Sequence, residues 1–443
     1  MMFATENDII RKDITIQVTG DCNLACTYCY QHSKNTKVVD INKAKKFLKS
    51  IVINDQSFWN DYMNFSSTKI APCIQFIGGE PLVNYKAIIE LCDYYYELCQ
   101  KHNPKLWCRT IFGICTNGTI YNKEIEDFLL KYKNKVSIGV SIDGNRELHD
   151  TCRRFKLTNA PSYDIAVSNL NKFRQVIGND TMVGTKFTVS PENIDKLSEA
   201  TINLFDTLNF KKVPANCVFE DVWTLEDAKK LYRELKKIAD WFLTKNYTID
   251  TMNLYNGNCT NREFGFFSER FFTGENDFDN VWCGGNGRMA FMQYDGKIYC
   301  CNRYGEISIG DPDKDLYIGT IEDGIIRKDV VQCLQCVKRQ TMYDNECKSC
   351  PVSRGCADCL AYCYEVHGEF KKTKHLCDMH KARSLANVYF WNKYYIQHNI
   401  KDKYMFLNLP LSEALKYVSE EELEMLLNVS NRRYVKDMKE KCC

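Results

Sequence analysis

Proline and long apolar runs are both scarce in this sequence. Its 443 residues include nine prolines, and no apolar run approaches the ~20 residues of a membrane-spanning helix. The charge is nearly balanced, with 59 Lys and Arg against 57 Asp and Glu, and no basic stripe interleaves with aromatic residues. These absences give no reason to expect a membrane or a nucleic acid as partner.

Cysteine, in contrast, is abundant, because the chain has 24 of them. Residues 1–13 are polar and charged, so the sequence shows no secretory signal. We therefore expect a cytoplasmic protein, in which thiols stay reduced and clustered cysteines indicate metal binding more often than disulfides. The length predicts two or three domains with a sizeable core.

Strand-like and helix-like segments alternate over the first half of the chain. The expected strands are 13–18, 74–77, 110–116, 136–142, 183–189 and 211–219, and the expected helices are 42–55, 84–101, 122–132, 163–177, 192–208 and 225–245. Short β-branched runs that alternate with helices predict an α/β fold with a parallel sheet. Six units fit a partial (β/α)6 barrel, in which chemistry collects at the C-terminal ends of the strands.

The second half has a different composition. Loop-rich sequence follows residue 245, and eleven cysteines lie between Cys283 and Cys377. Few long periodic segments occur there, so we expect metal to replace part of the hydrophobic core. The sequence becomes helical again near its end. We predict a barrel domain over 1–245, a cysteine-rich domain over 246–385 and a helical tail over 386–443.

Three cysteines stand close together directly after the first predicted strand. Cys22, Cys26 and Cys29 form a C-x3-C-x2-C pattern within "GDCNLACTYCYQ". A cluster of four irons needs four ligands, so three thiolates on one loop leave one iron open to a ligand from outside the protein. The alternatives are a zinc site that takes its fourth ligand elsewhere, or reduced structural thiols.

This pattern, with the aromatic Tyr28 before its last cysteine, resembles the signature of the radical S-adenosylmethionine (SAM) enzymes. The resemblance implies a 4Fe-4S cluster whose open iron binds S-adenosyl-L-methionine and cleaves it to a 5′-deoxyadenosyl radical. Other strand ends match the family in the same order, and the resemblance implies that they contact SAM. These are Gly78, Gly79, Glu80 and Pro81 for the amino group, Ser141 and Asp143 for the ribose, Arg153 or Arg154 for the carboxylate, and Asn117 and Thr188 at looser positions.

The cysteine-rich half resembles the SPASM domain, which carries auxiliary iron–sulfur clusters in radical SAM enzymes that modify peptides. The matching features are C-x12-G-x4-C from Cys283 to Cys301, the stretch "CKSCPVSRGCADCLAYC", and a final cysteine. The resemblance implies two auxiliary 4Fe-4S clusters. Their ligands would be Cys347, Cys350, Cys356 and Cys377 for the outer cluster, and Cys283, Cys301 and Cys359 for the inner one.

The inner cluster lacks a fourth ligand at the position where the family often has one. Either Cys259, Cys300 or Cys363 completes it, or one iron stays open and binds a substrate thiolate. A zinc module is the competing interpretation of this half. Cys333, Cys336, Cys347 and Cys350 read C-x2-C-x10-C-x2-C, which is close to a zinc ribbon that only binds a partner.

The resemblance extends to maturases of cysteine-rich and CXXX-repeat ribosomal peptides, on the stretches "CPVSRGCADCLAY" and "CDMHKARSLANVYFW". It implies a radical SAM peptide maturase that abstracts hydrogen from a precursor peptide and installs a cysteine thioether. The alternatives are formylglycine formation, as in the anaerobic sulfatase maturases, peptide epimerisation and carbon–carbon cross-linking. The expected partners are a precursor peptide or protein, an electron donor such as flavodoxin or ferredoxin, and a separate leader-binding protein, because only 21 residues precede Cys22.

Overall fold

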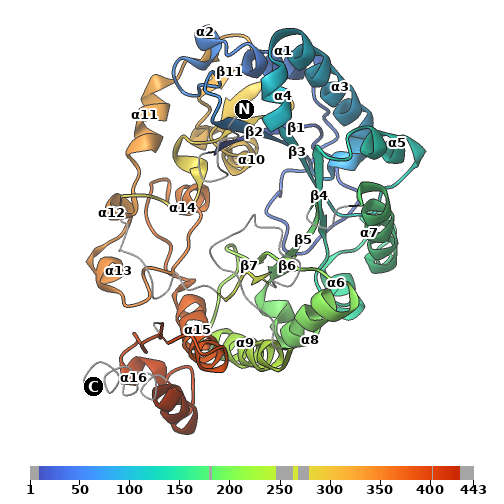
Figure 1. Cartoon of the computed structure of the whole chain (residues 1–443). Helices are drawn as coiled ribbons and strands as arrows, with labels where there is room; N and C mark the ends of the chain where they lie inside the picture. The colour runs from blue at the N-terminus through green and yellow to red at the C-terminus, as the bar shows by residue number, and fades with distance from the viewer. Residues whose placement is uncertain (1–8, 179–181, 246–262, 268–278, 402, 430–443) are drawn as a thin grey trace.

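The chain folds around one curved sheet whose strands come from both halves of the sequence (Figure 1). The computed structural model describes residues 9–178, 182–245, 263–267, 279–401 and 403–429. The strand order is β12-β11-β10-β9-β1-β2-β3-β4-β5-β7. The parallel part consists of β1 (Ile10–Gln17), β2 (Ile70–Ile77), β3 (Ile111–Thr116), β4 (Val136–Ser141), β5 (Val183–Val189) and β7 (Ala215–Cys217).

The parallel strands form because short β-branched runs alternate with amphipathic helices, and they align their C-terminal ends at one rim. Ile14 of β1 pairs with Ile74 of β2, and Ile114 of β3 pairs with Ile138 of β4. These four side chains are at most 3% exposed, so the ladder also forms the centre of the core. Polar residues that directly follow the strands therefore meet at the same rim.

Helices cover the outside of this sheet (Figure 1). They are α1 (Ile41–Val52), α2 (Gln56–Trp59), α3 (Tyr85–His102), α4 (Pro104–Arg109), α5 (Lys123–Lys131), α6 (Arg146–Cys152), α7 (Tyr163–Ile177), α8 (Leu197–Ile202) and α9 (Leu225–Lys245), with short turns η2 (Pro81–Asn84), η3 (Pro191–Lys196) and η4 (Asn203–Thr207). Local signals set their ends. Asp40 caps α1 by accepting from the amides of Asn42 and Lys43, and Gly178 ends α7 with a left-handed φ of 62°.

The cysteine-rich half extends the same sheet from the free edge of β1. Strand β9 (Ala290–Met292) lies parallel to β1, and β10 (Lys297–Tyr299), β11 (Gly319–Thr320) and β12 (Gly324–Ile325) continue antiparallel. The remaining elements of this half are short until the last long helix. They are η6 (Gly284–Asn286), α10 (Asn302–Gly310), η7 (Pro312–Lys314), α11 (Lys328–Cys336), α12 (Arg339–Met342), α13 (Asn345–Ser349) and α14 (Leu360–His367).

Helix α15 (Cys377–Gln397) ties the end of the chain to the barrel. It packs against α9, and Phe390 stacks on Phe267 with ring centroids 4.2 Å apart. The boundary that we predict at residue 385 falls inside this continuous helix. After it come α16 (Leu411–Ala414) and a helix over 420–429. None of the helices in the described ranges is both long and apolar enough to span a membrane.

The structure confirms the predicted α/β fold and differs from the expected elements in two places. The sixth strand, expected over 211–219, is divided between β6 (Lys212–Val213) and β7. Strand β6 leaves the main sheet because it pairs with β8 (Glu263–Phe264). The helix expected over 192–208 is also divided, into η3, α8 and the π-helical turn η4.

Candidate functional site

The three-cysteine loop lies at the rim, directly after β1. The backbone amide of Cys22 donates to Asp21 Oδ1 at 2.8 Å, which fixes the start of the loop. Burial raises the pKa of the Cys22 thiol to about 11 and also raises the pKa of Cys26. Metal binding must displace these protons, so the loop needs a nearby positive charge to hold three thiolates.

Lys34 supplies that charge, and sequence reasoning missed it. Burial works against its ammonium, but the Cys29, Cys22 and Cys26 thiols around it outweigh the burial and raise its pKa. Its Nζ also donates to the carbonyl of Leu24 within the loop at 3.3 Å. Three thiols gathered around one half-buried ammonium fit an anionic iron–sulfur cluster. No motif in the sequence marks this lysine.

The Gly78-Gly79-Glu80 turn after β2 packs directly against the cysteine loop. A Cβ on Gly79 would lie 2.4 Å from the carbonyl oxygen of Asp21 and 2.7 Å from the Cβ of Cys22. The amide of Glu80 donates to that same carbonyl at 2.8 Å. Glycine is therefore required at position 79 because two backbones approach too closely for a side chain. Pro81 follows as the first residue of η2.

Glu80 is 1% exposed and is held by the strand ends beside it. Its Oε1 accepts from the Thr116 hydroxyl at 2.7 Å and the Leu82 amide at 2.9 Å, and its Oε2 accepts from the Asn117 amide at 2.6 Å. Burial nevertheless raises its pKa to about 6, against the lowering effect of these hydrogen bonds. A buried carboxylate that lacks a full counter-charge can receive a ligand cation.

Asp143, after β4, joins the cysteine loop to Arg153. Its Oδ2 accepts from Arg153 Nε at 2.7 Å and from the hydroxyl of Tyr28, while its Oδ1 accepts from the Thr188 amide at 3.2 Å. Arg153 also points Nη1 at Cys26 Sγ, 3.7 Å away, and lies over the Tyr28 ring. The structure therefore brings Tyr28, Asp143, Arg153 and Thr188 together.

The other predicted SAM contacts are Arg154, Asn117 and Ser141, and they differ in whether they face the cysteine loop. Arg154 does not face the loop, because its Nη1 donates to the carbonyl of Asn159. The Asn117 side chain faces the loop, because its Nδ2 donates at 2.8 Å to Asn23 Oδ1 inside the cysteine loop. Ser141 ends β4 and is half-buried two residues before Asp143. Of the two arginines that the sequence left open, Arg153 is the one whose side chain lies beside the cysteine loop.

The inner set of cysteines gathers at three helix starts. Cys283, Cys301 and Cys359 are the N-cap residues of η6, α10 and α14. A Cβ on Gly285 would lie 3.4 Å from Cys283 Sγ and 3.9 Å from Cys301 Sγ, so these two thiols face the same space. Burial raises the pKa of Cys301, and the adjoining Cys359 and Cys283 thiols add to the effect. Helix N-termini stabilise thiolates, which fits an iron–sulfur ligand set.

Two of the three residues proposed as a fourth inner ligand have other partners. The Cys300 thiol accepts from the Tyr62 hydroxyl at 3.1 Å, and the Cys363 thiol lies 3.3 Å from the Thr373 hydroxyl. Cys259 lies outside the described residues. Cys363 nevertheless lies close enough to the inner set for its thiol to help raise the pKa of Cys359.

The outer set lines one small pocket. Cys347, Cys350, Cys356 and Cys377 surround it together with Lys372, His380 and Lys381. Both ring nitrogens of His380 are buried without a hydrogen-bond partner, although the ring is only 2% exposed. Four thiols, two ammonium groups and an unsatisfied imidazole fit an anionic cluster that would occupy the space between them.

The structure does not place the zinc-ribbon cysteines together. Cys333 and Cys336 are exposed on α11 and do not line the pocket that holds Cys347 and Cys350. Across the described ranges, no three His, Cys, Asp or Glu side chains lie close enough to hold a single metal ion. Cys347 and Cys350 instead share their pocket with Cys356 and Cys377, as the auxiliary-cluster pattern predicts.

A second missed feature connects the first loop to the inner set. Asn302, directly after Cys301, donates to the hydroxyl of Tyr30, directly after Cys29. The guanidinium of Arg303 lies 5.6 Å from the centre of the Tyr30 ring and pairs with Glu220 and Glu365. These contacts join residues far apart in the chain, so no local pattern predicts them.

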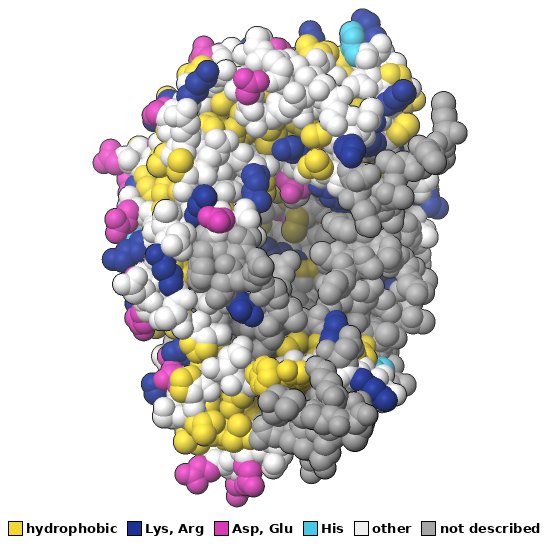
Figure 2. Space-filling view, turned by 60° about the vertical axis from the view of Figure 1, so that its left-hand side comes forward, with side chains coloured by type: hydrophobic (Ala, Val, Ile, Leu, Met, Phe, Trp, Pro, Cys, Tyr) yellow, Lys and Arg dark blue, Asp and Glu magenta, His cyan; other side chains and the backbone are white. Residues whose placement is uncertain are grey.

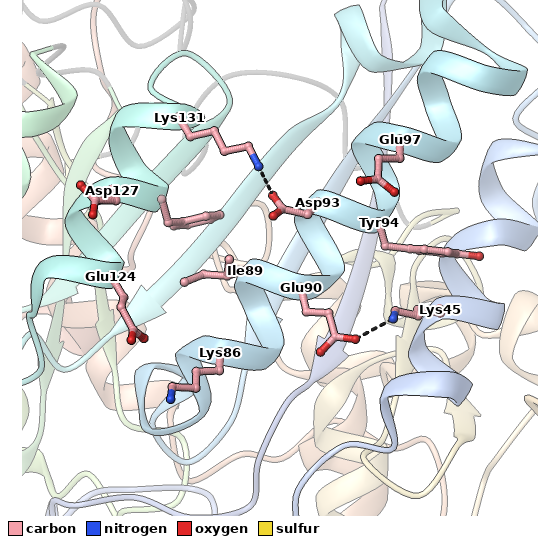
Figure 3. A pocket seen from close by; sticks show the side chains of 11 residues that line it. Lys45, Lys86, Ile89, Glu90, Asp93, Tyr94, Glu97, Glu124, Asp127 and Lys131 are labelled. Atoms are coloured by element: carbon pink, nitrogen blue, oxygen red, sulfur yellow. Dashed lines mark hydrogen bonds and ion pairs between the residues drawn. The ribbon is translucent and has the colours of Figure 1, made fainter.

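A larger groove lies away from all of these residues. It has a volume of about 760 Å³ and runs along the outer helices between α3 and α5, with Lys45–Glu90 and Lys131–Asp93 ion pairs at its sides (Figure 3). It contains no cysteine. Figure 2 shows that another side of the molecule is hollowed near its middle, with basic, acidic and hydrophobic side chains at the edge. The chemistry of the rim does not extend to the groove in Figure 3.

Comparison with known proteins agrees with this geometry. Residues 16–201 match the family model of the radical SAM superfamily. The chain is 27% identical to a cysteine-type anaerobic sulfatase-maturating enzyme of Clostridium perfringens, over 76% of this chain and 85% of the relative. It is 34% identical to an uncharacterized protein of Methanocaldococcus jannaschii over 33% of this chain, and it spans 43% of that relative's length.

A solved structure shares the fold of nearly the whole molecule. The structure of native anSMEcpe with bound AdoMet and Cp18Cys peptide superimposes with a TM-score of 0.61 and 19% identity, covering 88% of this chain and all of that one. The barrel and the cysteine-rich half together share the fold of that structure. The similarity to the radical SAM superfamily covers residues 16–201, the part of the chain that contains the three-cysteine loop, Glu80, Asp143 and Arg153.

Proposed function

We propose that this enzyme is a maturase that modifies a ribosomally made peptide or protein. The observation that carries the proposal is the gathering of three cysteine sets, one on the radical SAM loop and two in the cysteine-rich half. The similarity to a sulfatase-maturating enzyme over most of both chains supports a peptide or protein substrate.

In this proposal the rim residues hold SAM. Cys22, Cys26 and Cys29 bind the cluster, which with SAM supplies a carbon radical that abstracts hydrogen. Glu80 receives the SAM ammonium, because its buried carboxylate lacks a full counter-charge. Arg153 receives the SAM carboxylate, and Tyr28 and Asp143 orient its guanidinium. Ser141, Asn117 and Thr188 border the remaining part of the ligand, together with Gly78, Gly79 and Pro81.

We further propose two auxiliary clusters. Cys347, Cys350, Cys356 and Cys377 hold the outer one, and Cys283, Cys301 and Cys359 hold the inner one with one iron open. The other candidate thiols among the described residues, Cys300 and Cys363, pair with Tyr62 and Thr373. An iron left open by Cys283, Cys301 and Cys359 would offer a binding position for a cysteine thiolate of the substrate.

The modification proposed from this arrangement is a thioether, in which a substrate cysteine sulfur bonds to the carbon that lost hydrogen. The second candidate is formylglycine formation, favoured by the similarity to the cysteine-type sulfatase maturase. The two products differ in mass. Both reactions remove two hydrogens from the peptide, but a thioether keeps the sulfur, whereas formylglycine formation also replaces the cysteine sulfur with oxygen.

The proposal also needs a reductant, such as flavodoxin or ferredoxin, and a leader-binding protein if the described domains do not recognise the leader themselves. The test is to purify the protein without oxygen, reconstitute it, and measure iron, zinc and 5′-deoxyadenosine. We expect about twelve irons, and about eight with no SAM cleavage in a Cys22→Ala/Cys26→Ala/Cys29→Ala variant. Mass spectrometry of cysteine-containing peptides then identifies the product. Zinc without iron, and no SAM cleavage, would overturn the proposal.

A further inference from the structure

His380 is the residue whose surroundings the proposed function does not yet explain. It lies in the first turn of α15, three residues after Cys377, and it is 2% exposed. The backbone of Ala357 lies beside its ring, yet neither ring nitrogen makes a hydrogen bond of normal geometry. Buried polar groups are nearly always paired, so an imidazole with two unpaired nitrogens indicates that its partner is a ligand.

The space that the ring faces is the outer cysteine pocket. His380 lines it together with Cys347, Cys350, Cys356 and Cys377. Every form of imidazole carries at least one N–H, and that donor needs an acceptor. Lys372 and Lys381 also border the pocket, and ammonium groups offer donors only. Besides the hydroxyls of Tyr343 and Ser353, the side-chain acceptors that line the pocket are sulfur atoms, of the thiolates or of a cluster that they hold.

Lys372, Tyr343 and Lys381, which line the same pocket, already have partners of their own. Lys372 Nζ donates to Asp358 Oδ2 at 3.3 Å and to the Ala357 carbonyl at 3.4 Å, and Tyr343 donates to the same Asp358 oxygen at 2.6 Å. Lys381 pairs with Glu413 at 2.7 Å. The Ala357 carbonyl accepts from Lys372, and neither ring nitrogen of His380 has a hydrogen-bond partner, although the ring lines the pocket that the four cysteine sulfurs surround.

We propose that His380 donates a hydrogen bond to a sulfur of the outer auxiliary cluster and is a positioning residue that sets the reduction potential of that cluster. The proposal rests on the outer cluster of the proposed function. A hydrogen bond to sulfur stabilises the reduced, more negative cluster, so the bond raises its potential. His380 would then determine how readily this cluster accepts an electron.

The test uses the reconstituted full-length enzyme labelled with nitrogen-15 in its histidines. In wild type, pulsed electron paramagnetic resonance of the reduced auxiliary clusters should detect a weak coupling to one histidine nitrogen. The coupling should vanish in His380→Asn and persist in His398→Asn, a control at the other end of α15. A coupling as strong as that of a direct iron ligand would overturn the hydrogen bond, as would no coupling with the outer cluster present.

Potentials give an independent readout. His380→Leu removes the donor and should lower the midpoint potential of one auxiliary cluster, whereas His380→Asn keeps an N–H and should restore part of the difference. Iron content is measured in parallel, with Cys347→Ala as the variant that removes the outer cluster. If wild type and Cys347→Ala hold equal iron, the outer cluster itself is absent and both proposals fail. If the iron differs and no potential moves, the histidine proposal alone is wrong.

Discussion

Arg153 and Asp143 form an ion pair of 2.7 Å at the rim, with side chains only 9% and 0% exposed. The same guanidinium reaches Cys26 Sγ at 3.7 Å. A charge pair so deeply buried is strongly destabilised when one partner is lost, because the other remains as an uncompensated charge. The pair therefore fixes Arg153 beside the cysteine loop before any ligand binds.

Two substitutions of Arg153 should separate its effect on SAM binding from its effect on the free energy of unfolding. A lysine keeps the charge but cannot contact Asp143 and Cys26 together, because it lacks the forked guanidinium. We expect Arg153→Lys to weaken SAM binding more than about tenfold, a loss of about 1.4 kcal/mol. Arg153→Leu should lower the free energy of unfolding by about 3–5 kcal/mol. Anaerobic equilibrium dialysis and urea denaturation measure these two effects.

Arg154 provides the matched control, since its side chain donates to the carbonyl of Asn159. Its backbone carbonyl accepts from the Ala25 amide, a contact that a side-chain substitution leaves in place. Arg154→Lys should leave SAM affinity within about twofold of wild type, because an exposed contact contributes little free energy. Equal losses in the two lysine variants would contradict the assignment of Arg153.

Gly79 provides a geometric prediction. A Cβ at this position would meet the Asp21 carbonyl oxygen at 2.4 Å, whereas a Cβ on Gly139 of β4 has no atom within 4 Å. Gly79→Ala must therefore displace the cysteine loop, and we expect it to lose about four irons with all SAM cleavage. Gly139→Ala should keep the wild-type iron content. Iron analysis of the two purified variants measures this difference. Retention of all iron in Gly79→Ala would show that the cysteine loop tolerates the displacement.

The sequence predicts the parts of this site that depend on local pattern. Alternation of short apolar runs and amphipathic helices places β1 to β5, and the spacing of Cys22, Cys26 and Cys29 marks the loop. The sequence does not predict the position of Lys34 among the thiols, the contact of Arg303 with Tyr30 or the burial of His380, because those depend on contacts between distant segments. The division of the sixth strand into β6 and β7 was not predicted for the same reason, because β8, which pairs with β6, lies outside the first half of the chain.

Glu80 makes the protein's properties depend on pH. Burial raises its pKa from an ordinary 4.5 to about 6, so the folded SAM-free state binds more protons than the unfolded state between these values. The contribution of Glu80 to the free energy of unfolding is therefore greatest below pH 4.5 and is lost as the pH rises through 6, by about 2 kcal/mol in total. Urea denaturation of the SAM-free protein should show this decrease relative to Glu80→Gln, which does not titrate.

The same carboxylate should couple SAM binding to pH in the opposite direction. A SAM ammonium needs the ionised form, so affinity should fall as the pH drops below about 6 and Glu80 becomes protonated. Glu80→Gln should bind weakly at every pH, whereas Glu90→Gln, at an exposed ion pair with Lys45 on the outer helices, should behave as wild type. An affinity that is flat between pH 5 and 7 in wild type, by anaerobic dialysis, would remove Glu80 from the ammonium site.

The Tyr30–Asn302 contact should couple the radical SAM loop to the inner cysteine set. Each residue follows a proposed cluster ligand, Cys29 or Cys301, so their hydrogen bond holds two ligand loops in register. We expect Tyr30→Phe and Asn302→Leu each to lower the free energy of unfolding by about 1 kcal/mol. The double variant should lose less than the sum, because both changes remove one shared bond. Tyr96→Phe, on the outer surface where the ring packs against Trp107, should change little. A double variant whose loss equals the sum of the single losses would show that the two loops are held independently.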